Sequence, residues 1–123
     1  MRAIKITPNP AEPIEIIAVE PGFRNLARAI GGPCEYIERF RCPLTHAFSL
    51  VGVCDEDGLS NGQPDNQRAW PLYPVPGYTL KGTVLVLREE FDPMEGADFA
   101  DMDEAMAEAA RRLVVDLLER VRA

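Results

Sequence analysis

The stretch at residues 79–87, TLKGTVLVL, decides the expected fold, because it is the most apolar strand-like segment of the 123-residue chain. Successive side chains of a strand point to opposite faces of a sheet. The unbroken apolar run from Val84 to Leu87 therefore needs cover on both faces. We expect this segment to be a central strand, with other parts of the chain packed on each side of it.

Four further segments predict strands on the N-terminal side of this one. They are rich in the β-branched and aromatic residues that pleated sheets favour. These segments are residues 2–7 (RAIKIT), 13–19 (PIEIIAV), 34–40 (CEYIERF) and 48–54 (FSLVGVC). The first two are separated by the turn Pro8-Asn9-Pro10, and so short a connection permits only an antiparallel hairpin.

Two segments have the periodicity of a helix. Residues 21–30 place Phe23, Leu26 and Ile30 on one face, and Gly31-Gly32 ends the segment because glycine readily adopts the left-handed conformation beyond a helix. Residues 101–122 predict an amphipathic C-terminal helix with Asp101 as its N-cap. Its apolar stripe consists of Met106, Ala109, Leu113, Leu117 and Val121, broadened by Val114 and Leu118.

The apolar stripe of the C-terminal helix needs a partner surface. The first helix, at ten residues, is only about 15 Å long and is too short to shield a five-stranded sheet. We therefore expect the C-terminal helix to pack on its own sheet, which favours a monomer. Pairing of this helix with the same helix of a second copy, giving a homodimer, is the alternative.

The predicted element order is β-β-α-β-β-β-α, which indicates an α+β fold with a mixed or antiparallel sheet of about five strands and two helices. This order is typical of a β-grasp arrangement or of another helix-on-sheet fold with a different strand order. A chain of 123 residues is too short for two well-buried cores, so residues 1–123 are expected to form a single domain.

The charge of the chain is concentrated in one stretch. Residues 89–108 hold nine acidic residues and no Lys or Arg, and the net charge of the whole chain is −7. We expect residues 89–100 to be a solvated acidic connector, whose end satisfies the positive N-terminus of the last helix. Alternatives are a docking surface for a basic partner protein and a mimic of DNA. Binding to duplex nucleic acid is not expected, because phosphates repel this charge.

The sequence also bears on cellular location. No apolar run approaches the ~20 residues of a membrane span, and no secretory signal is visible, so no membrane association is expected. The three cysteines form an odd set, which favours reduced thiols in a cytoplasmic protein.

Cys34, Cys42, Cys54 and His46 make up a zinc-ligand set by residue type alone. If the third and fourth strands pair about the turn at residues 43–45, Cys42 faces His46 and Cys34 faces Cys54. The two pairs would then be about 26 Å apart, too far for one metal ion. The expectation is core thiols, with no metal, no cofactor and no catalytic residues.

The segment at residues 70–78, WPLYPVPGY, contains Trp70, Tyr73 and Tyr78. Aromatic side chains on a proline-stiffened loop form a binding surface at low entropic cost. Such a loop can also fold back and pack its rings on the domain, and this alternative stays open.

Five short segments form one further pattern: GG at 31–32, EYI at 35–37, VCDEDG at 53–58, PDNQRA at 64–69 and KGTVLV at 81–86. This pattern resembles a family of short phage and mobile-element proteins catalogued as a domain of unknown function (number 3846). The resemblance covers residues 1–87 and implies a small accessory protein. The Asn-x-Arg segment of that family corresponds to Asn66 and Arg68 here.

These observations favour a non-enzymatic accessory protein of a phage or mobile element that binds and modulates a protein partner. The alternatives are a small-ligand-binding protein or enzyme that uses the loop at residues 55–70, and an acidic inhibitor that mimics DNA. The expected binding residues are Asp57, Asn66, Arg68, Trp70, Tyr73 and Tyr78.

Overall fold

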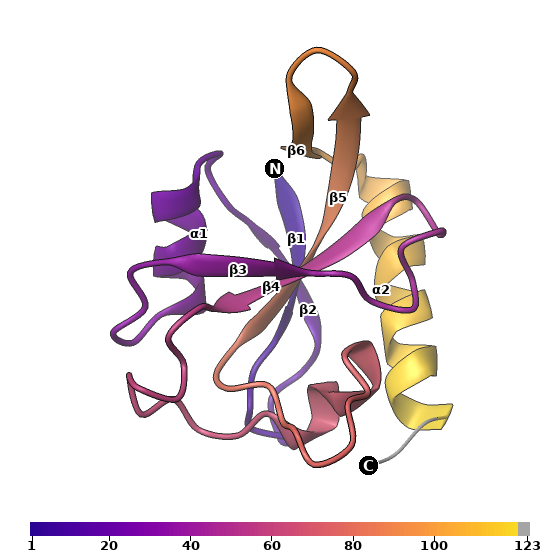
Figure 1. Cartoon of the computed structure of the whole chain (residues 1–123). Coiled ribbons are helices and arrows are strands. Elements are labelled where there is room, and N and C mark those ends of the chain that lie inside the picture. Colours follow the sequence, from indigo (N-terminus) through magenta and orange to yellow (C-terminus); the bar gives the residue numbers. More distant parts are fainter. Residues whose placement is uncertain (121–123) are drawn as a thin grey trace.

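The computed structural model describes residues 1–120, which form an α+β fold with one antiparallel sheet. The strands are β1 (Arg2–Ile6), β2 (Glu15–Ala18), β3 (Ile37–Phe40), β4 (Leu50–Asp55), β5 (Val84–Asp92) and β6 (Gly96–Ala100). The helices are α1 (Phe23–Ile30), the short 3-10 helix η1 (Gln67–Leu72) and α2 (Glu104–Arg120). Figure 1 shows α1 and α2 on opposite sides of the sheet.

Strand β5 lies at the centre of the sheet, as its apolar run predicts. The strand order is β2-β1-β5-β4-β3, with β6 also paired to β5. Every neighbouring pair of strands is antiparallel, including β1 with β5. The expected hairpin of the first two strands is confirmed. The sheet is thus the antiparallel helix-on-sheet arrangement rather than a β-grasp, in which the first and last strands run parallel.

The alternation along β5 divides the core into two clusters. Leu85 and Leu87 face α1, where they pack with Leu26 and Ile30. The second cluster lies under α2 and η1, and it includes Val84, Val86, Met102, Ala107, Ala110 and Val114. All of these β5 side chains are fully buried. The sheet therefore has apolar cover on both faces.

Helix α2 packs on its own sheet, as expected from its apolar stripe. Its fully buried positions are Ala107, Ala110 and Val114, so the face toward the core is turned from the expected stripe, whose members Met106, Ala109, Leu113 and Leu117 are half-buried. The expected N-cap was wrong: Asp103 caps the helix, with its carboxylate accepting the Met106 N–H at 2.7 Å. Asp101 instead accepts the backbone N–H of Arg2 at 2.8 Å, which ties the start of β1 to the end of β6. The stripe residue Val121 lies outside the described residues.

The acidic segment 89–100 is not a connector, which corrects the sequence-based expectation. Strand β5 continues to Asp92, and β6 folds back on it with Asp92 opposite Gly96. The Asp92 carboxylate accepts the N–H groups of Met94 and Glu95 at 2.7 and 3.3 Å, which fixes the turn. Because residues 89–100 are so polar, their sequence did not predict this hairpin. Its strands are paired mainly through their backbones.

The register of β3 with β4 also differs from the expected one. Glu38, not Cys34, lies opposite Cys54. The connection between these strands is longer than a tight turn, and it includes positive φ angles of 54° and 56° at Phe48 and Ser49. The pairing therefore moves by four residues relative to a turn at residues 43–45.

No helix within residues 1–120 is long and apolar enough to span a membrane.

Candidate functional site

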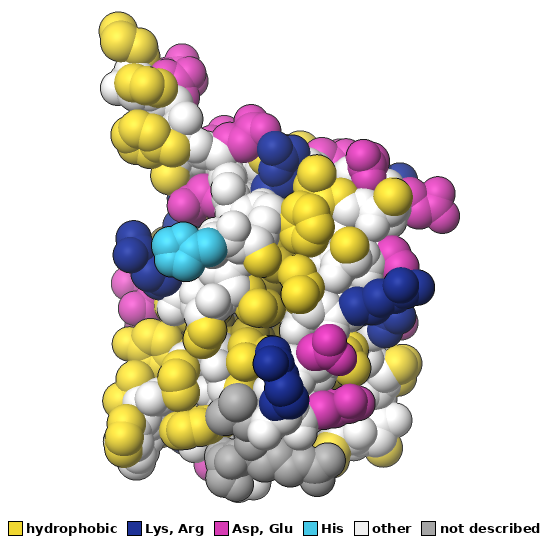
Figure 2. Space-filling view, turned by 90° about the vertical axis from the view of Figure 1, so that its right-hand side faces the viewer, with side chains coloured by type: hydrophobic (Ala, Val, Ile, Leu, Met, Phe, Trp, Pro, Cys, Tyr) yellow, Lys and Arg dark blue, Asp and Glu magenta, His cyan; other side chains and the backbone are white. Residues whose placement is uncertain are grey.

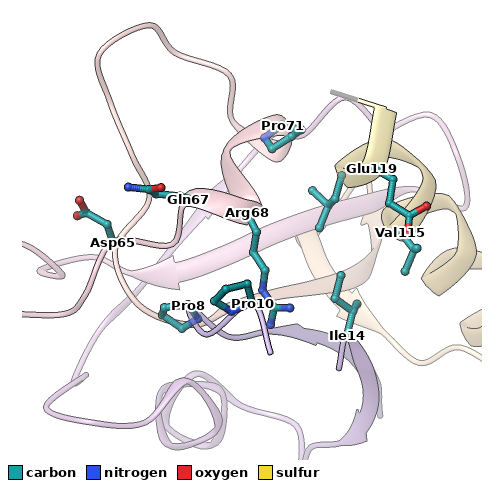
Figure 3. Close-up of a pocket in the computed structure, with 10 residues that line it drawn as sticks. Pro8, Pro10, Ile14, Asp65, Gln67, Arg68, Pro71, Val115 and Glu119 are labelled. Atoms are coloured by element: carbon teal, nitrogen blue, oxygen red, sulfur yellow. The ribbon is translucent and has the colours of Figure 1, made fainter. Parts of the chain in front are cut away.

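Arg68 has a structural role that its sequence pattern did not reveal. Its side chain extends from η1 to the turn between β1 and β2 (Figure 3). Its Nε and Nη1 atoms donate to the carbonyl oxygens of Thr7 and Glu12, both at 2.7 Å, and Nη2 donates to the Thr7 hydroxyl at 3.0 Å. Burial lowers the pKa of Arg68, although the guanidinium stays charged. Arg68 thus holds the turn in place.

A cavity of about 550 Å³ lies beside Arg68, between the β1–β2 turn, η1 and the end of α2. Its walls are mostly apolar, and they include Pro8, Pro10, Ile14 and Pro71. The volume is that of a small-molecule site. However, three of the guanidinium N–H groups are already bonded to the turn, and neither Asp57 nor Asn66 lines the cavity.

Asn66 is fully buried and joins the end of β1 to the segment that precedes β5. Its Nδ2 atom donates to the carbonyl oxygens of Ile6 and Gly82, each at 2.9 Å, and its backbone N–H donates to the Leu80 carbonyl at 2.8 Å. The Oδ1 atom has no partner among the described residues. Since Asn66 is enclosed and its amide donors are satisfied by the backbone, it is a structural residue in this fold.

Asp57 is exposed, and the organising group of its turn is the neighbouring Asp55. The Asp55 carboxylate accepts the Asp57 N–H at 2.9 Å and the side-chain amides of Asn61 and Gln63 at 2.9 and 3.2 Å. Burial acts to raise the pKa of Asp55, but these hydrogen bonds outweigh burial and hold its pKa below the usual range. Asp57, Asn66 and Arg68 therefore do not converge on one site.

The three thiols are held in the protonated form. Burial raises the pKa of Cys54 to about 12 and the pKa of Cys34 to about 11, with further contributions from nearby carboxylates. Burial also raises the pKa of Cys42. A nucleophilic cysteine needs the opposite shift. Within residues 1–120, no cluster of His, Cys, Asp and Glu side chains has the arrangement of a metal site.

The aromatic loop folds back on the domain at one side and leaves a groove at the other. The Tyr73 ring packs edge-on against Phe40 at 5.5 Å and against Tyr78 at 5.8 Å. Trp70 is half-buried, and its Nε1 donates to the Val75 carbonyl at 3.3 Å. A second cavity of about 550 Å³ lies beside this loop. It is lined by Glu38, Arg39, Phe40, Arg41, Cys54, Tyr73, Val75, Tyr78 and Leu80. We call this cavity the β3 groove.

The β5–β6 hairpin is the most prominent surface feature. Strand β4 pairs with β5 only as far as Arg88, and beyond that point β6 is the one strand paired with β5 in the described part of the chain. Residues 89–99, which we call the arm, therefore project from the body, at the top of Figure 1 and of Figure 2. Phe91 and Met94 on the arm are 74% and 91% exposed.

The two faces of the arm differ in chemistry. Phe91 is opposite Ala97, and on the same face Glu89 is opposite Phe99. Phe99 contacts Phe23 of α1 edge-on at 6.1 Å, which extends an apolar strip from the arm to the body. On the other face Glu90 lies directly opposite Asp98. Figure 2 shows the mixture of apolar and acidic side chains on this projection.

Several acids near the arm have local structural partners. Glu89 pairs with Arg39 at 2.8 Å and Glu90 with Arg88 at 3.2 Å. Glu95 makes no ion pair among the described residues, and the Asp98 carboxylate accepts only the adjacent Phe99 N–H there. The acidic stretch therefore combines structural groups with free charge at the arm.

Sequence reasoning missed Phe91, Met94 and Phe99 as surface residues of interest. The signal was present as an alternation of apolar and polar residues on each side of the DPMEG turn, at residues 92–96. The high acidity of the segment obscured it.

Comparisons of the chain with protein-family models, with curated proteins and with solved structures give no match. The family resemblance of residues 1–87 therefore stays a prediction.

Proposed function

We propose that this protein is a non-enzymatic accessory protein that binds a partner protein through the arm and thereby modulates it. The observation that carries the proposal is the exposure of Phe91 and Met94 at the end of a projecting hairpin. Exposed apolar clusters on monomeric proteins mark interaction sites. The phage or mobile-element setting implied by the family resemblance is part of the same proposal.

The arm is built at a cost in stability, which supports a functional role. A two-stranded hairpin is marginally stable by itself. Glu90 and Asp98 face each other across its strands, and directly opposed like charges destabilise a sheet, although the ion pair of Glu90 with Arg88 offsets part of this repulsion. The facing pair of Glu90 and Asp98 contributes nothing to the core of the domain. A partner with basic residues would relieve the repulsion between these two carboxylates.

The chemistry of the arm indicates the kind of partner surface. Phe91 and Met94 would enter an apolar pocket, and the free acids Glu95 and Asp98 would meet Lys or Arg at its rim. The alternative of an acidic DNA mimic has less support, because many of the acids in this stretch accept backbone N–H groups or pair with arginine.

The other proposed alternative, an enzyme or small-ligand binder using the loop at 55–70, also has less support. Asn66 and Arg68 are engaged in holding the backbone, and the thiols are held protonated.

The experiment is retention of partner proteins from cells that encode this protein, on immobilised wild type and on a Phe91→Ser/Met94→Ser double variant. Leu59→Ser is the matched control, because Leu59 is 79% exposed and lies in the loop after β4, outside the arm. Burial of one large apolar side chain is worth about 1.5–3 kcal/mol. The double variant should therefore bind at least ~100-fold more weakly.

We expect one protein to be retained in a stoichiometric amount by wild type and by Leu59→Ser, and lost with the double variant. Equal retention by all three proteins would remove the arm as the binding site. Retention of a second copy of this chain instead of another protein would contradict the proposed partner class.

A further inference from the structure

The free edge of β3 and the β3 groove beside it lie outside the tip of the arm, although Arg39 of the groove pairs with Glu89 at the base of the arm. We propose that this edge accepts an extended segment of a partner protein as an added antiparallel or parallel strand. The added segment would carry an apolar or aromatic residue and a basic residue two positions apart. The site goes beyond the proposed function of the arm, since it uses other residues and another binding mode.

The backbone groups of β3 point alternately toward β4 and away from the sheet. The Tyr36 carbonyl accepts the Glu56 N–H at 3.0 Å, so Tyr36 points its backbone groups toward β4. The N–H and C=O of one strand residue point to the same side, and the side alternates along the strand. Glu38 therefore also points toward β4, whereas Ile37 and Arg39 point outward. Neither has a backbone partner on that side among the described residues.

The β3 groove lies directly beside this strand. Four consecutive residues of the chain, at positions 38–41, line it. Glu38 is paired with Cys54 and lies on one face of the strand with Phe40, so the cavity is on this face and also reaches the strand at Arg39 and Arg41. Its opposite wall is the aromatic loop with Tyr73, Val75 and Tyr78. In Figure 1, β3 is the strand in front, with its outer edge uncovered by any helix.

The shape of the groove depends on a close approach between β3 and β4. The Phe40 ring lies over Gly52, where an added Cβ would be only 2.2 Å from the ring Cζ atom. The ring can lie this flat only because Gly52 has no side chain. Phe40, Tyr73 and Tyr78 then form a row of edge-on aromatic contacts along the groove.

The side chains of β3 on the groove side determine which residues an added segment should carry. On the groove side of β3, Glu38 and Phe40 are two residues apart, and Glu38 is exposed without an ion pair among the described residues. Cross-strand neighbours interact most strongly when they pair opposite charges or aromatic with apolar groups. A segment paired with β3 would therefore place a basic residue opposite Glu38 and an apolar one opposite Phe40. Arg39 and Arg41 also line the groove, but the alternation of the strand turns the Arg39 side chain to the other face, where it pairs with Glu89, and Arg41 follows the end of β3.

The test uses synthetic, terminally blocked heptapeptides in a threonine host. Two peptides carry a tyrosine and a lysine separated by one residue, in either order, because a strand can join a sheet edge in either direction. One control carries the same residues at adjacent positions, so that they lie on opposite faces of the peptide. A second control carries N-methylated amides, which cannot pair with a strand edge. Binding is followed by the amide signals of the protein in two-dimensional NMR spectra.

We expect an odd–even pattern. The amide protons of Ile37 and Arg39 should move downfield, because they gain hydrogen bonds, while those of Glu38 and Phe40 already face β4 and should move little. Tyr78→Ala should weaken binding by about fivefold, the equivalent of one aromatic contact. Tyr78 is 45% exposed, so this variant should keep a dispersed native spectrum. Glu38→Gln should weaken binding of the lysine peptides and not of the same peptides with norleucine in place of lysine.

Phe91→Ala is the control that separates this site from the arm, and it should leave peptide binding unchanged. Absence of shifts at millimolar peptide, equal binding of the adjacent-position control, or shifts without the odd–even pattern would overturn the proposal. Pairing of β3 with β3 of a second copy, seen as concentration-dependent shifts without peptide, would also overturn it.

Discussion

Replacing Asn66 with alanine should destabilise the fold by about 3 kcal/mol, because two buried hydrogen bonds are lost and two carbonyl groups lose a donor. The bonds are those from Nδ2 to Ile6 and Gly82, each 2.9 Å long. A net contribution of about 1 kcal/mol for each bond, with the desolvation cost of the unpaired carbonyls added, gives this figure. Domains of this size have total stabilities of about 5–15 kcal/mol, so the loss is large but leaves a folded protein.

The assay is thermal and urea unfolding followed by circular dichroism. A loss of this size corresponds to a Tm about 10 °C lower for a chain of this length. Asn66→Asp is nearly isosteric but replaces the two donors by a carboxylate that faces two carbonyls, and it should be destabilised further. Gln67→Ala, at an exposed neighbouring position, should stay within about 0.5 kcal/mol of wild type.

The reasoning would be refuted if Asn66→Ala unfolded at the wild-type temperature. If that variant also lost partner binding, Asn66 would be a binding residue, as the sequence pattern suggested.

Four other predictions follow from named contacts. Gly52→Ala should cost about 1–3 kcal/mol of unfolding free energy, since the new Cβ overlaps the Phe40 ring; Phe40→Leu combined with it should recover part of the loss in urea unfolding. At mildly alkaline pH iodoacetamide should modify Cys34 and Cys54 much more slowly in the native than in the unfolded protein, because burial raises their pKa values to about 11 and 12; equal labelling rates, measured by mass spectrometry, would disprove this. The pKa of Asp55 is lowered in the folded state. Its contribution to stability is therefore present above the pKa of an unfolded aspartate and is lost as the pH falls through the folded pKa; in acid titrations Asp55→Asn should lack this part of the pH dependence. Finally, with a net charge of −7 the protein should not retard duplex DNA in a gel at physiological salt, and salt-sensitive retention would contradict that expectation.

The parts of the fold that sequence predicted are those with a strong local signal. The unbroken apolar run from Val84 to Leu87 predicted a central strand with cover on both faces. The apolar stripe of residues 101–122 predicted a helix that packs on another surface. These signals depend on side chains a few positions apart, so tertiary context did not override them.

The parts that sequence did not predict depend on distant pairing. Strand β6 has only one large apolar side chain, Phe99, and it pairs with the part of β5 that extends beyond β4. The β3–β4 register also differs from the expected one, and the connection contains two left-handed residues, Phe48 and Ser49, which are not glycines and carry no turn signature.

The candidate residues show the same division. The sequence picked out Asn66 and Arg68 but could not show that their partners are backbone carbonyls about sixty residues earlier in the chain. The structure places Tyr73 and Tyr78 together on the wall of the β3 groove, and the binding role of these two residues remains a prediction. Trp70 does not line the β3 groove, but its Nε1 donates to the carbonyl oxygen of the groove residue Val75.

The most direct test of the account is photo-cross-linking from the tip of the arm in cells that encode the protein. A photoreactive amino acid replaces Met94, which is 91% exposed, and in a matched control it replaces Leu59, which is 79% exposed. We predict one covalent adduct with a single partner protein from position 94 and none from position 59. The absence of an adduct at position 94, or an equal yield from both positions, would contradict the assignment of the arm as the partner-binding site.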